Sequence, residues 1–274
     1  MEDDTKDLLN TCSSLIRRLN DRIHKLESFA SDIVHEFKNP LTSIKMSVDL
    51  LSNENLNDED RKDLYKSIND ELNHMDILLK DIRDVSKNEI SENDNKENVS
   101  IVSLVENIIK REKSFYKDVS FEITSRDSIF LCNITPEKIV CILENIIDNA
   151  ASFAVNSNEK KVLVFLDLFI SSRNEYRICI SVQDTGIGIQ EKEENRIFNR
   201  FYSKRDDEEK KNHSGLGLSI TKMMVESLGG FIGAKNSTTL CGAEFYLQLP
   251  IQEKDIDKEI LEKIKEKKEC HFKY

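Results

Sequence analysis

The chain has 274 residues, of which 38% are hydrophobic and 33% charged, and its formal net charge is −11. This length gives room for about two domains with buried cores. The acidic balance, with no dominant basic patch, argues against nucleic acid as a partner.

No segment approaches the roughly 20 consecutive apolar residues that cross a bilayer, and the acidic start is unlike a signal peptide. We therefore expect no membrane contact by this chain itself. The six cysteines are scattered and form no closely spaced pair. They are expected to be reduced packing residues of a cytosolic protein, without a metal site or a disulfide framework.

Residues 1–28 are expected to form an exposed helix that leads into a longer one at 29–52. Apolar side chains recur there every three or four residues, which is typical of a helix with one apolar seam. His35 lies off this seam and faces water, and Asn39 follows one turn later on the same face. Pro40 predicts a kink beside the histidine. This placement indicates a reaction site, although a lone surface histidine more often has no role.

Turn-forming residues at 53–58 break the helical pattern, with Asp58 as a candidate helix N-cap. A second amphipathic helix follows, with apolar side chains spaced from Leu64 to Ile82 along one face. Two long helices with a short connection form an antiparallel hairpin, which alone buries too little surface. We therefore expect two copies to pair as a four-helix bundle. The polar residues 87–98 are expected to be a linker.

The second half alternates helices and strands and contains all eight glycines, which lie between residues 186 and 242. Such irregular alternation predicts an α+β fold in which helices cover one face of a sheet. Thr135 and Pro136 predict a helix start, as N-cap and first helical residue. The predicted helices are 101–113, 136–155 and 216–228, and the predicted strands are 119–125, 129–134, 162–170, 176–183, 231–236 and 243–249.

Five motifs in this order resemble those of the bacterial two-component sensor histidine kinases, and the resemblance extends from about residue 20 to 250. They are the phosphoacceptor box at 35–42, the N box at 143–150, the first glycine box at 184–189, the F box at 197–202 and the second glycine box at 215–220. Short glycine motifs recur by chance, so the order of all five carries the resemblance. Residues 148–153 and 212–217 resemble the ChvG-type envelope sensors in particular.

The resemblance implies a phosphoacceptor hairpin, an ATP-binding sandwich of the histidine-kinase (Bergerat) type, and transfer of the ATP γ-phosphoryl group to His35. Glu36 would orient or deprotonate the imidazole. Asn39 stands where the family orients water for dephosphorylation of a response regulator. The implied partners are a second copy of the chain and a cognate response regulator, and the implied place is the cytoplasm, either as a free protein or as part of an inner-membrane sensor.

The resemblance also implies the residues that bind ATP and Mg²⁺. Asn149 would bind magnesium, Asn145 would lie beside the phosphates, and Asp184 would accept a hydrogen bond from the adenine amino group. Gly186 and Gly188 would let the backbone approach the base. The remaining nucleotide contacts are assigned to the second glycine box and to the F box with the start of a lid: Gly215, Leu216, Gly217, Arg200, Tyr202 and Lys204.

Several positions depart from the family pattern, and two other functions stay open. Ala151 and Ser152 stand where the family usually has a basic residue, and Ala243 replaces a frequent threonine. One alternative is a catalytically weak dimeric scaffold that binds a regulator. The other is an ATPase of the gyrase and Hsp90 superfamily, although those enzymes use a glutamate where this chain has Asn145.

The expected organisation divides the chain into four segments. They are a signalling helix at 1–28, a dimerisation and histidine phosphotransfer domain at 29–88, a catalytic ATP-binding domain at 99–250 and a charged helical tail at 251–274.

Overall fold

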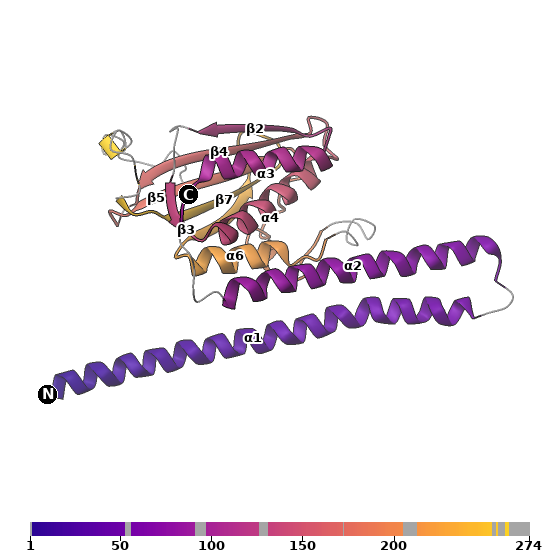
Figure 1. The fold of residues 1–274 in the computed structure, drawn as a ribbon, viewed down its shortest axis with the longest axis horizontal. Helices are drawn as coiled ribbons and strands as arrows, with labels where there is room; N and C mark the ends of the chain where they lie inside the picture. Colours follow the sequence, from indigo (N-terminus) through magenta and orange to yellow (C-terminus); the bar gives the residue numbers. More distant parts are fainter. Residues whose placement is uncertain are drawn as a thin grey trace. The chain divides into compact units, whose positions relative to one another are not determined.

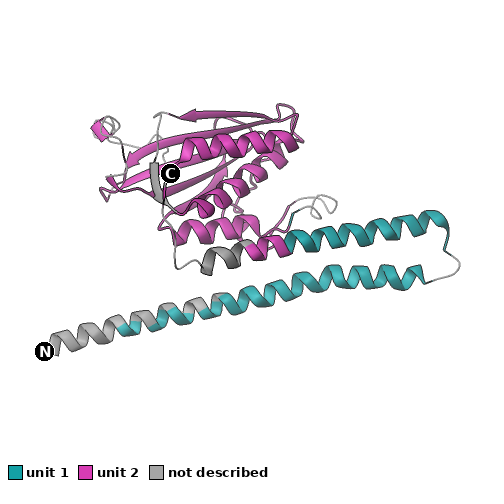
Figure 2. Ribbon diagram, in the orientation of Figure 1, with its two compact units in different colours: residues 1–78, 207–213 teal, residues 79–206, 214–274 magenta. Residues whose placement is uncertain are grey.

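The computed structural model describes residues 2–52, 56–90, 97–125, 131–171, 173–204, 213–253, 256 and 261–262 (Figure 1). The chain divides into two compact units, one of residues 1–78 and 207–213 and the other of residues 79–206 and 214–274 (Figure 2). Within the described ranges, no helix combines the length and apolar composition that a membrane span requires.

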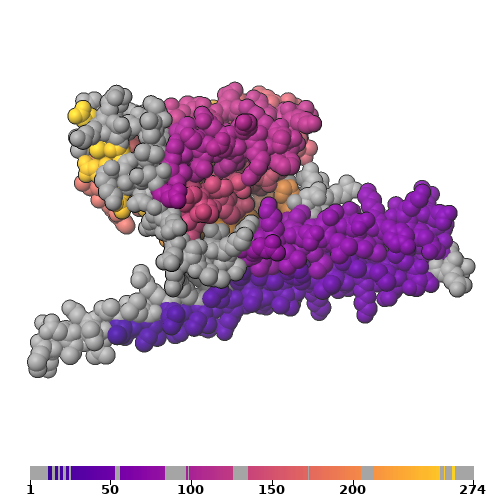
Figure 3. All heavy atoms as spheres, viewed as in Figure 1, coloured from indigo at the N-terminus to yellow at the C-terminus, as the bar shows by residue number. Residues whose placement is uncertain are grey.

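The first unit is built on a helical hairpin, as predicted. Helix α1 (Glu2–Leu51) joins the two expected N-terminal helices into one and continues through Pro40, which is buried. Helix α2 (Asp58–Ile90) runs antiparallel to α1, and within the first unit the atoms of the two helices form one surface (Figure 3). The kink at Pro40 stays a prediction.

The residue that caps α2 is Asn57, and the prediction of Asp58 was wrong by one position. The Asn57 side chain accepts a hydrogen bond from the Asp60 backbone N–H at 2.7 Å and donates one to the Asp60 carboxylate at 2.8 Å. An amide side chain can both donate and accept, so it forms a reciprocal cap that Asp58 could not form from inside the helix.

Much of the apolar seam of the hairpin stays exposed in the single chain. Leu19 is 59% exposed, Leu41 53% and Leu72 48%. A row of exposed large apolar side chains along a helix is typical of a surface that packs against a partner.

The predicted linker at 87–98 is partly regular structure. Helix α2 continues to Ile90, because no glycine or proline interrupts it. Strand β1 (Glu97–Ser100) begins inside the same segment and pairs antiparallel with β3 (Leu131–Ile134). That pairing partner is distant in sequence, so the local composition does not reveal the strand.

The second unit contains a five-stranded sheet in the order β2-β4-β5-β7-β6. Strand β2 runs parallel to β4, and the other neighbours are antiparallel. The strands are β2 (Ser120–Ser125), β4 (Lys161–Ile170), β5 (Tyr176–Asp184), β6 (Phe231–Asn236) and β7 (Ala243–Pro250).

Three helices cover one face of this sheet, which confirms the predicted α+β sandwich (Figure 1). They are α3 (Ile101–Phe115), α4 (Pro136–Ala154) and α6 (Gly217–Ser227). Helix α4 begins with Thr135 and Pro136 as predicted. Its Ile142, Leu143 and Ile147 are fully buried, as are Ile178 and Ile180 on β5. Most of the predicted tail at 251–274 lies outside the described residues.

Candidate nucleotide-binding and phosphoacceptor sites

The N-box helix α4 meets the second glycine box. Asn145 and Asn149 lie one turn apart on α4, and both are half-buried. The Asn145 side-chain amide donates to the Gly217 carbonyl oxygen at 3.4 Å. A Cβ atom added to Gly217 would lie 3.7 Å from this same amide. Two motifs that are far apart in sequence therefore meet in one site.

Helix α6 presents its N-terminus there. Leu216 is the N-cap residue and is fully buried, and Gly217 is the first residue of the helix. The buried Thr221 hydroxyl donates to the Gly217 carbonyl at 2.8 Å. The backbone N–H groups of the first turn have no partner within the helix, so they are able to bind phosphate oxygens.

Asp184 is held rigidly at the end of β5, which pairs antiparallel with the start of β7. It is 1% exposed. The backbone N–H groups of Gly186 and Ala243 donate to its Oδ1 at 2.7 and 3.1 Å. Burial raises the pKa of this carboxyl to about 6, although those two bonds lower it. Among the described contacts both bonds end on Oδ1, so Oδ2 is the oxygen that can accept from a ligand.

The chain approaches itself closely around Asp184, and the two glycines Gly242 and Gly186 make this possible. A Cβ atom on Gly242 would lie 2.2 Å from Asp184 Oδ1 and 2.4 Å from the Asp184 carbonyl oxygen. A Cβ atom on Gly186 would lie 2.8 Å from the Cβ of Phe153. Gly186 was among the predicted site residues and Gly242 was not, although the position of Gly242 just before a strand was a usable signal.

Asn236 fixes the first glycine box, although it was not among the predicted site residues. Its side chain accepts from the Ile189 N–H at 2.7 Å and donates to the Ile189 carbonyl at 2.9 Å. Gly188 lies against it with φ of +72°, and a Cβ atom there would be 2.7 Å from Asn236 Oδ1. No local pattern marks Asn236, because its partner is 47 residues away.

Replacement of Asn236 by alanine is expected to loosen this loop. The variant loses two hydrogen bonds at an exposed site, each worth about 1 kcal/mol net. We expect a loss of about 1–2 kcal/mol in the free energy of unfolding and faster hydrogen exchange at the Ile189 amide. Asn195→Ala is the control, since that side chain caps its short helix without a hydrogen bond. Equal exchange at Ile189 in both variants would contradict the assignment.

The F box and the second glycine box are joined at the base of the predicted lid. The Phe201 N–H donates to the Gly215 carbonyl at 2.9 Å. Gly215 has φ of +72°, and a Cβ atom there would lie 2.9 Å from the Phe201 backbone. The middle of the lid, residues 205–212, lies outside the described residues.

The three F-box candidates have different surroundings. Lys204 forms an ion pair with the buried Glu193 carboxylate and holds the pKa of that carboxyl below its usual range. Tyr202 is half-buried, and the Arg196 guanidinium lies 5.4 Å from its ring centroid. Arg200 is also half-buried. Lys204 therefore supports the structure of this loop. A phosphate group could contact Lys204 only in competition with the Glu193 carboxylate.

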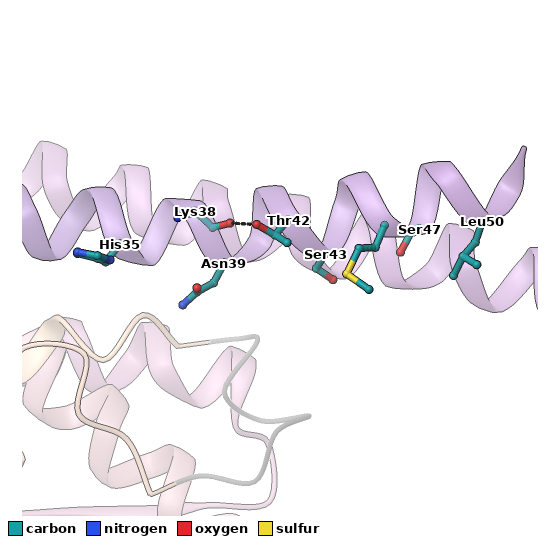
Figure 4. A pocket seen from close by; sticks show the side chains of 8 residues that line it. His35, Lys38, Asn39, Thr42, Ser43, Ser47 and Leu50 are labelled. Atoms are coloured by element: carbon teal, nitrogen blue, oxygen red, sulfur yellow. Dashed lines mark hydrogen bonds between the residues drawn. The ribbon is translucent and has the colours of Figure 1, made fainter.

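The phosphoacceptor candidate lies on α1, and both His35 and Asn39 are exposed as predicted. They project from the same side of the helix and border a hollow of about 600 Å³ (Figure 4). The Thr42 hydroxyl donates to the Lys38 carbonyl at 2.7 Å. The other described residues around this hollow also belong to α1: Lys38, Thr42, Ser43, Met46, Ser47 and Leu50.

Glu36 differs from its neighbour His35 in being half-buried. Burial raises the pKa of its carboxyl, and His74 on α2 opposes this rise. Asp32 raises the pKa further and His35 lowers it. Glu36 is thus in electrostatic contact with groups from both helices of the hairpin.

The donor set of the second unit fits a magnesium ion that arrives with a nucleotide. Among the described residues, no three His, Cys, Asp or Glu side chains gather into a metal site. Mg²⁺ favours oxygen ligands and usually keeps phosphate and water oxygens around it. The amide oxygen of Asn149 could supply one ligand without a dedicated cage.

Ala151 and Ser152, which stand where the family usually has a basic residue, are both buried. Ala151 is fully buried and Ser152 is 6% exposed. The Ser152 hydroxyl donates to the Asn149 carbonyl at 2.8 Å. Both side chains at these positions are thus packed inside the unit, and the Ala243 backbone N–H donates to Asp184 although a frequent threonine is absent there.

Two family models match the chain, and together they cover most of it. The "His Kinase A (phospho-acceptor) domain" matches residues 25–90. The "Histidine kinase-, DNA gyrase B-, and HSP90-like ATPase" matches residues 134–253. The first match contains His35, and the second contains both asparagines, Asp184 and all the glycines.

Similar curated proteins are sensor proteins. "Sensor protein ChvG" of Rhizobium meliloti is 31% identical over 91% of this chain and 44% of its own length. "Sensor protein kinase WalK" of Staphylococcus aureus is 30% identical over 82% of this chain and 53% of its own length. The chain thus spans about half the length of these relatives.

Among solved structures, the histidine kinase AdeS of Acinetobacter baumannii aligns over 80% of this chain and 98% of its own, with a TM-score of 0.57 and 19% identity. Full-length ShkA in complex with AMPPNP aligns over 79% of this chain and 44% of its own, with a TM-score of 0.53 and 22% identity. These two structures support the fold.

Proposed function

Because the chain belongs to the two-component sensor histidine kinases, we propose that it transfers the γ-phosphoryl group of ATP to His35 and then to an aspartate of a response regulator. One observation carries this proposal. In the α/β unit Asn145 contacts Gly217 and the Asp184 carboxyl is buried, while a helix of the hairpin exposes a histidine in the phosphoacceptor motif.

Each nucleotide contact follows from the chemistry of the residue. Asp184 Oδ2 accepts from the adenine amino group, and the α6 N-terminus with Gly215, Leu216 and Gly217 binds phosphate oxygens. The amide oxygen of Asn149 serves as one ligand of the magnesium ion, and Asn145 lies beside the phosphates. Gly186 and Gly188 shape the pocket for the adenine base. The side of the nucleotide site where the predicted lid begins is formed by Arg200, Tyr202 and Lys204.

At His35 an imidazole nitrogen forms the bond to the γ-phosphorus while the bond to the bridging oxygen of ATP breaks and ADP leaves. A neutral imidazole is already a nucleophile, so catalysis needs positioning and charge neutralisation more than activation. Glu36 orients the ring or accepts its proton. Asn39, exposed on the same face, positions water for the reverse signalling step, removal of the regulator's phosphoryl group.

The proposal includes a homodimer and a cytoplasmic location, where ATP is available. The exposed seam of the hairpin supports pairing into a four-helix bundle. We propose the domain limits 29–88 for the phosphotransfer domain and 99–250 for the ATP-binding domain, with a signalling helix before them and a tail after them.

The two alternatives are not favoured. An ATPase of the gyrase and Hsp90 type needs a carboxylate to activate water, and Asn145 offers only an amide. A silent scaffold would have no need of the packed Asp184 and glycine contacts.

The test is incubation of the purified chain with γ-labelled ATP and Mg²⁺. We expect an acid-labile label on the wild type and none on His35→Gln or Asn149→Ala. His24→Gln is the matched control and should label normally, since His24 is an exposed histidine on the same helix. Label that persists in His35→Gln would contradict the assigned acceptor.

The raised pKa of Asp184 predicts a pH dependence of nucleotide binding. As the pH falls through about 6 the carboxylate gains a proton, and the charged acceptor for the adenine amino group is lost. The effect of pH on the stability of the fold has the opposite sign. Because the pKa is raised in the folded state, protonation of Asp184 stabilises the folded form. This stabilisation is lost as the pH rises from about 4 to about 6.

We therefore expect the affinity advantage of the wild type over Asp184→Asn to shrink about tenfold between pH 7.5 and pH 5, measured by calorimetry with ATP. The comparison cancels the titration of the ATP phosphates, which is common to both proteins. An advantage that is the same at both pH values would contradict this role of Asp184.

A further inference from the structure

Helix α2 contacts the segment that leads into the second glycine box. The Ser214 hydroxyl donates a hydrogen bond to Oδ2 of Asp81, which lies 133 residues earlier in the chain. Both residues belong to the second unit, which includes α2 from Leu79 onward (Figure 2). Ser214 is buried, and the proposed reaction uses neither side chain. A hydrogen bond between distant segments therefore connects α2 to the residue directly before Gly215.

Ser214 forms a second hydrogen bond, in which it is the acceptor. The Leu216 N–H donates to the Ser214 Oγ at 2.9 Å. A hydroxyl group has one hydrogen to donate and lone pairs that accept. Because the Asp81 carboxylate takes the hydrogen, the lone pairs of Oγ are left for the Leu216 N–H. Two hydrogen bonds in series thus join α2 to Leu216.

This series of bonds occupies a backbone donor of the proposed phosphate site. Leu216 is the N-cap residue of α6, so its N–H group lies at the start of the helix. Phosphate oxygens bind to helix N-termini through such backbone N–H groups. An N–H group has a single hydrogen, so its bond to Ser214 weakens any bond to a phosphate oxygen. A phosphate group therefore competes with Ser214 for this donor.

We propose that Asp81 is a positioning residue that lowers the affinity of the nucleotide site by holding Ser214 on the Leu216 N–H. The inference rests on the proposed function, in which Leu216 contributes to phosphate binding. Asp81 does not touch the nucleotide, and it acts only through Ser214. Such coupling is reciprocal, so a phosphate group that takes the Leu216 N–H also weakens the bond between Ser214 and Asp81. Nucleotide binding is thereby coupled to a contact of α2.

The test measures the binding of AMPPNP, an ATP analogue that resists phosphoryl transfer, and of adenosine, which has no phosphate groups. Both ligands are titrated by calorimetry with Mg²⁺ into the wild type, Asp81→Ala, Ser214→Ala and the double variant. Asp81→Asn keeps an acceptor for the Ser214 hydroxyl and removes the negative charge. Asp76→Ala, at an exposed carboxylate of the same helix, is the matched control.

We expect AMPPNP to bind Asp81→Ala and Ser214→Ala about fivefold more tightly than the wild type, which is the effect of one competing hydrogen bond. The double variant should match Ser214→Ala, because Asp81 acts only through that hydroxyl. Asp81→Asn should gain less than Asp81→Ala, and Asp76→Ala should gain nothing. Adenosine should bind all the variants equally, which also shows that the base pocket is folded in each of them.

An unchanged AMPPNP affinity in Asp81→Ala would overturn the inference, and so would an equal gain for adenosine. A gain that persists when Asp81→Ala is added to Ser214→Ala would overturn it too, because the effect would then come from the charge alone. A chain that shows the expected affinities but never labels His35 from ATP would overturn the proposed function and leave the inference intact. Binding of neither ligand to any variant would overturn both.

Discussion

Replacement of Gly242 by alanine is expected to abolish nucleotide binding and to destabilise the ATP-binding unit. The new Cβ atom would lie 2.2 Å from Asp184 Oδ1 and 2.6 Å from the Gly186 backbone nitrogen, so the backbone has to move. That movement breaks the bond from the Gly242 N–H to the Asp184 carbonyl, which is 3.1 Å in the native structure. Overpacking and lost buried hydrogen bonds together cost about 3 kcal/mol or more.

For a unit of this size the loss corresponds to a fall in Tm of about 10 °C, measured by calorimetry. Gly217→Ala is the matched control, because its Cβ atom would be 3.7 Å from Asn145, an ordinary contact. That variant should keep its Tm or gain slightly, because alanine loses less conformational entropy than glycine on folding. A Gly242→Ala chain that melts with the wild type and binds ATP would contradict the described contact.

Replacement of Asp184 by asparagine is expected to separate binding from folding. The asparagine oxygen can still accept from the Gly186 and Ala243 N–H groups, so the loop is retained. The other oxygen becomes an NH₂ group that faces the adenine amino group, and two donors cannot form a hydrogen bond. Loss of a hydrogen bond to a buried charged acceptor weakens ATP binding on the order of 100-fold.

The Tm of Asp184→Asn without nucleotide should be equal to or above that of the wild type, because the substitution removes a carboxylate whose ionisation is disfavoured by burial. Asp118→Asn, at an exposed carboxylate of the same unit, should leave both ATP affinity and Tm unchanged. An ATP affinity within about threefold of the wild type would show that Asp184 does not contact the base.

The elements and motifs of this chain were readable from sequence because their signals are local. Helix α1 follows from apolar spacing of three and four, and α4 from Thr135 and Pro136 ahead of an apolar run. The sheet strands ended within one or two residues of their predicted limits. The order of five motifs was sufficient to name the family, because each motif is a short contiguous segment.

The missed features all depend on partners that are distant in sequence. Asn236 pairs with Ile189, and β1 pairs with β3. The cap of α2 was missed for another reason. Asn57 and Asp58 both have good capping side chains, and only the hydrogen bonds to Asp60 distinguish them.

The measurement that tests the central claim most directly is phosphosite mapping of the chain after incubation with ATP and Mg²⁺. Fragmentation that preserves phosphohistidine should place the phosphoryl group on His35. The other four histidines, at positions 24, 74, 213 and 271, should carry none. A phosphoryl group at another histidine, or none on a chain that binds ATP, would contradict the account.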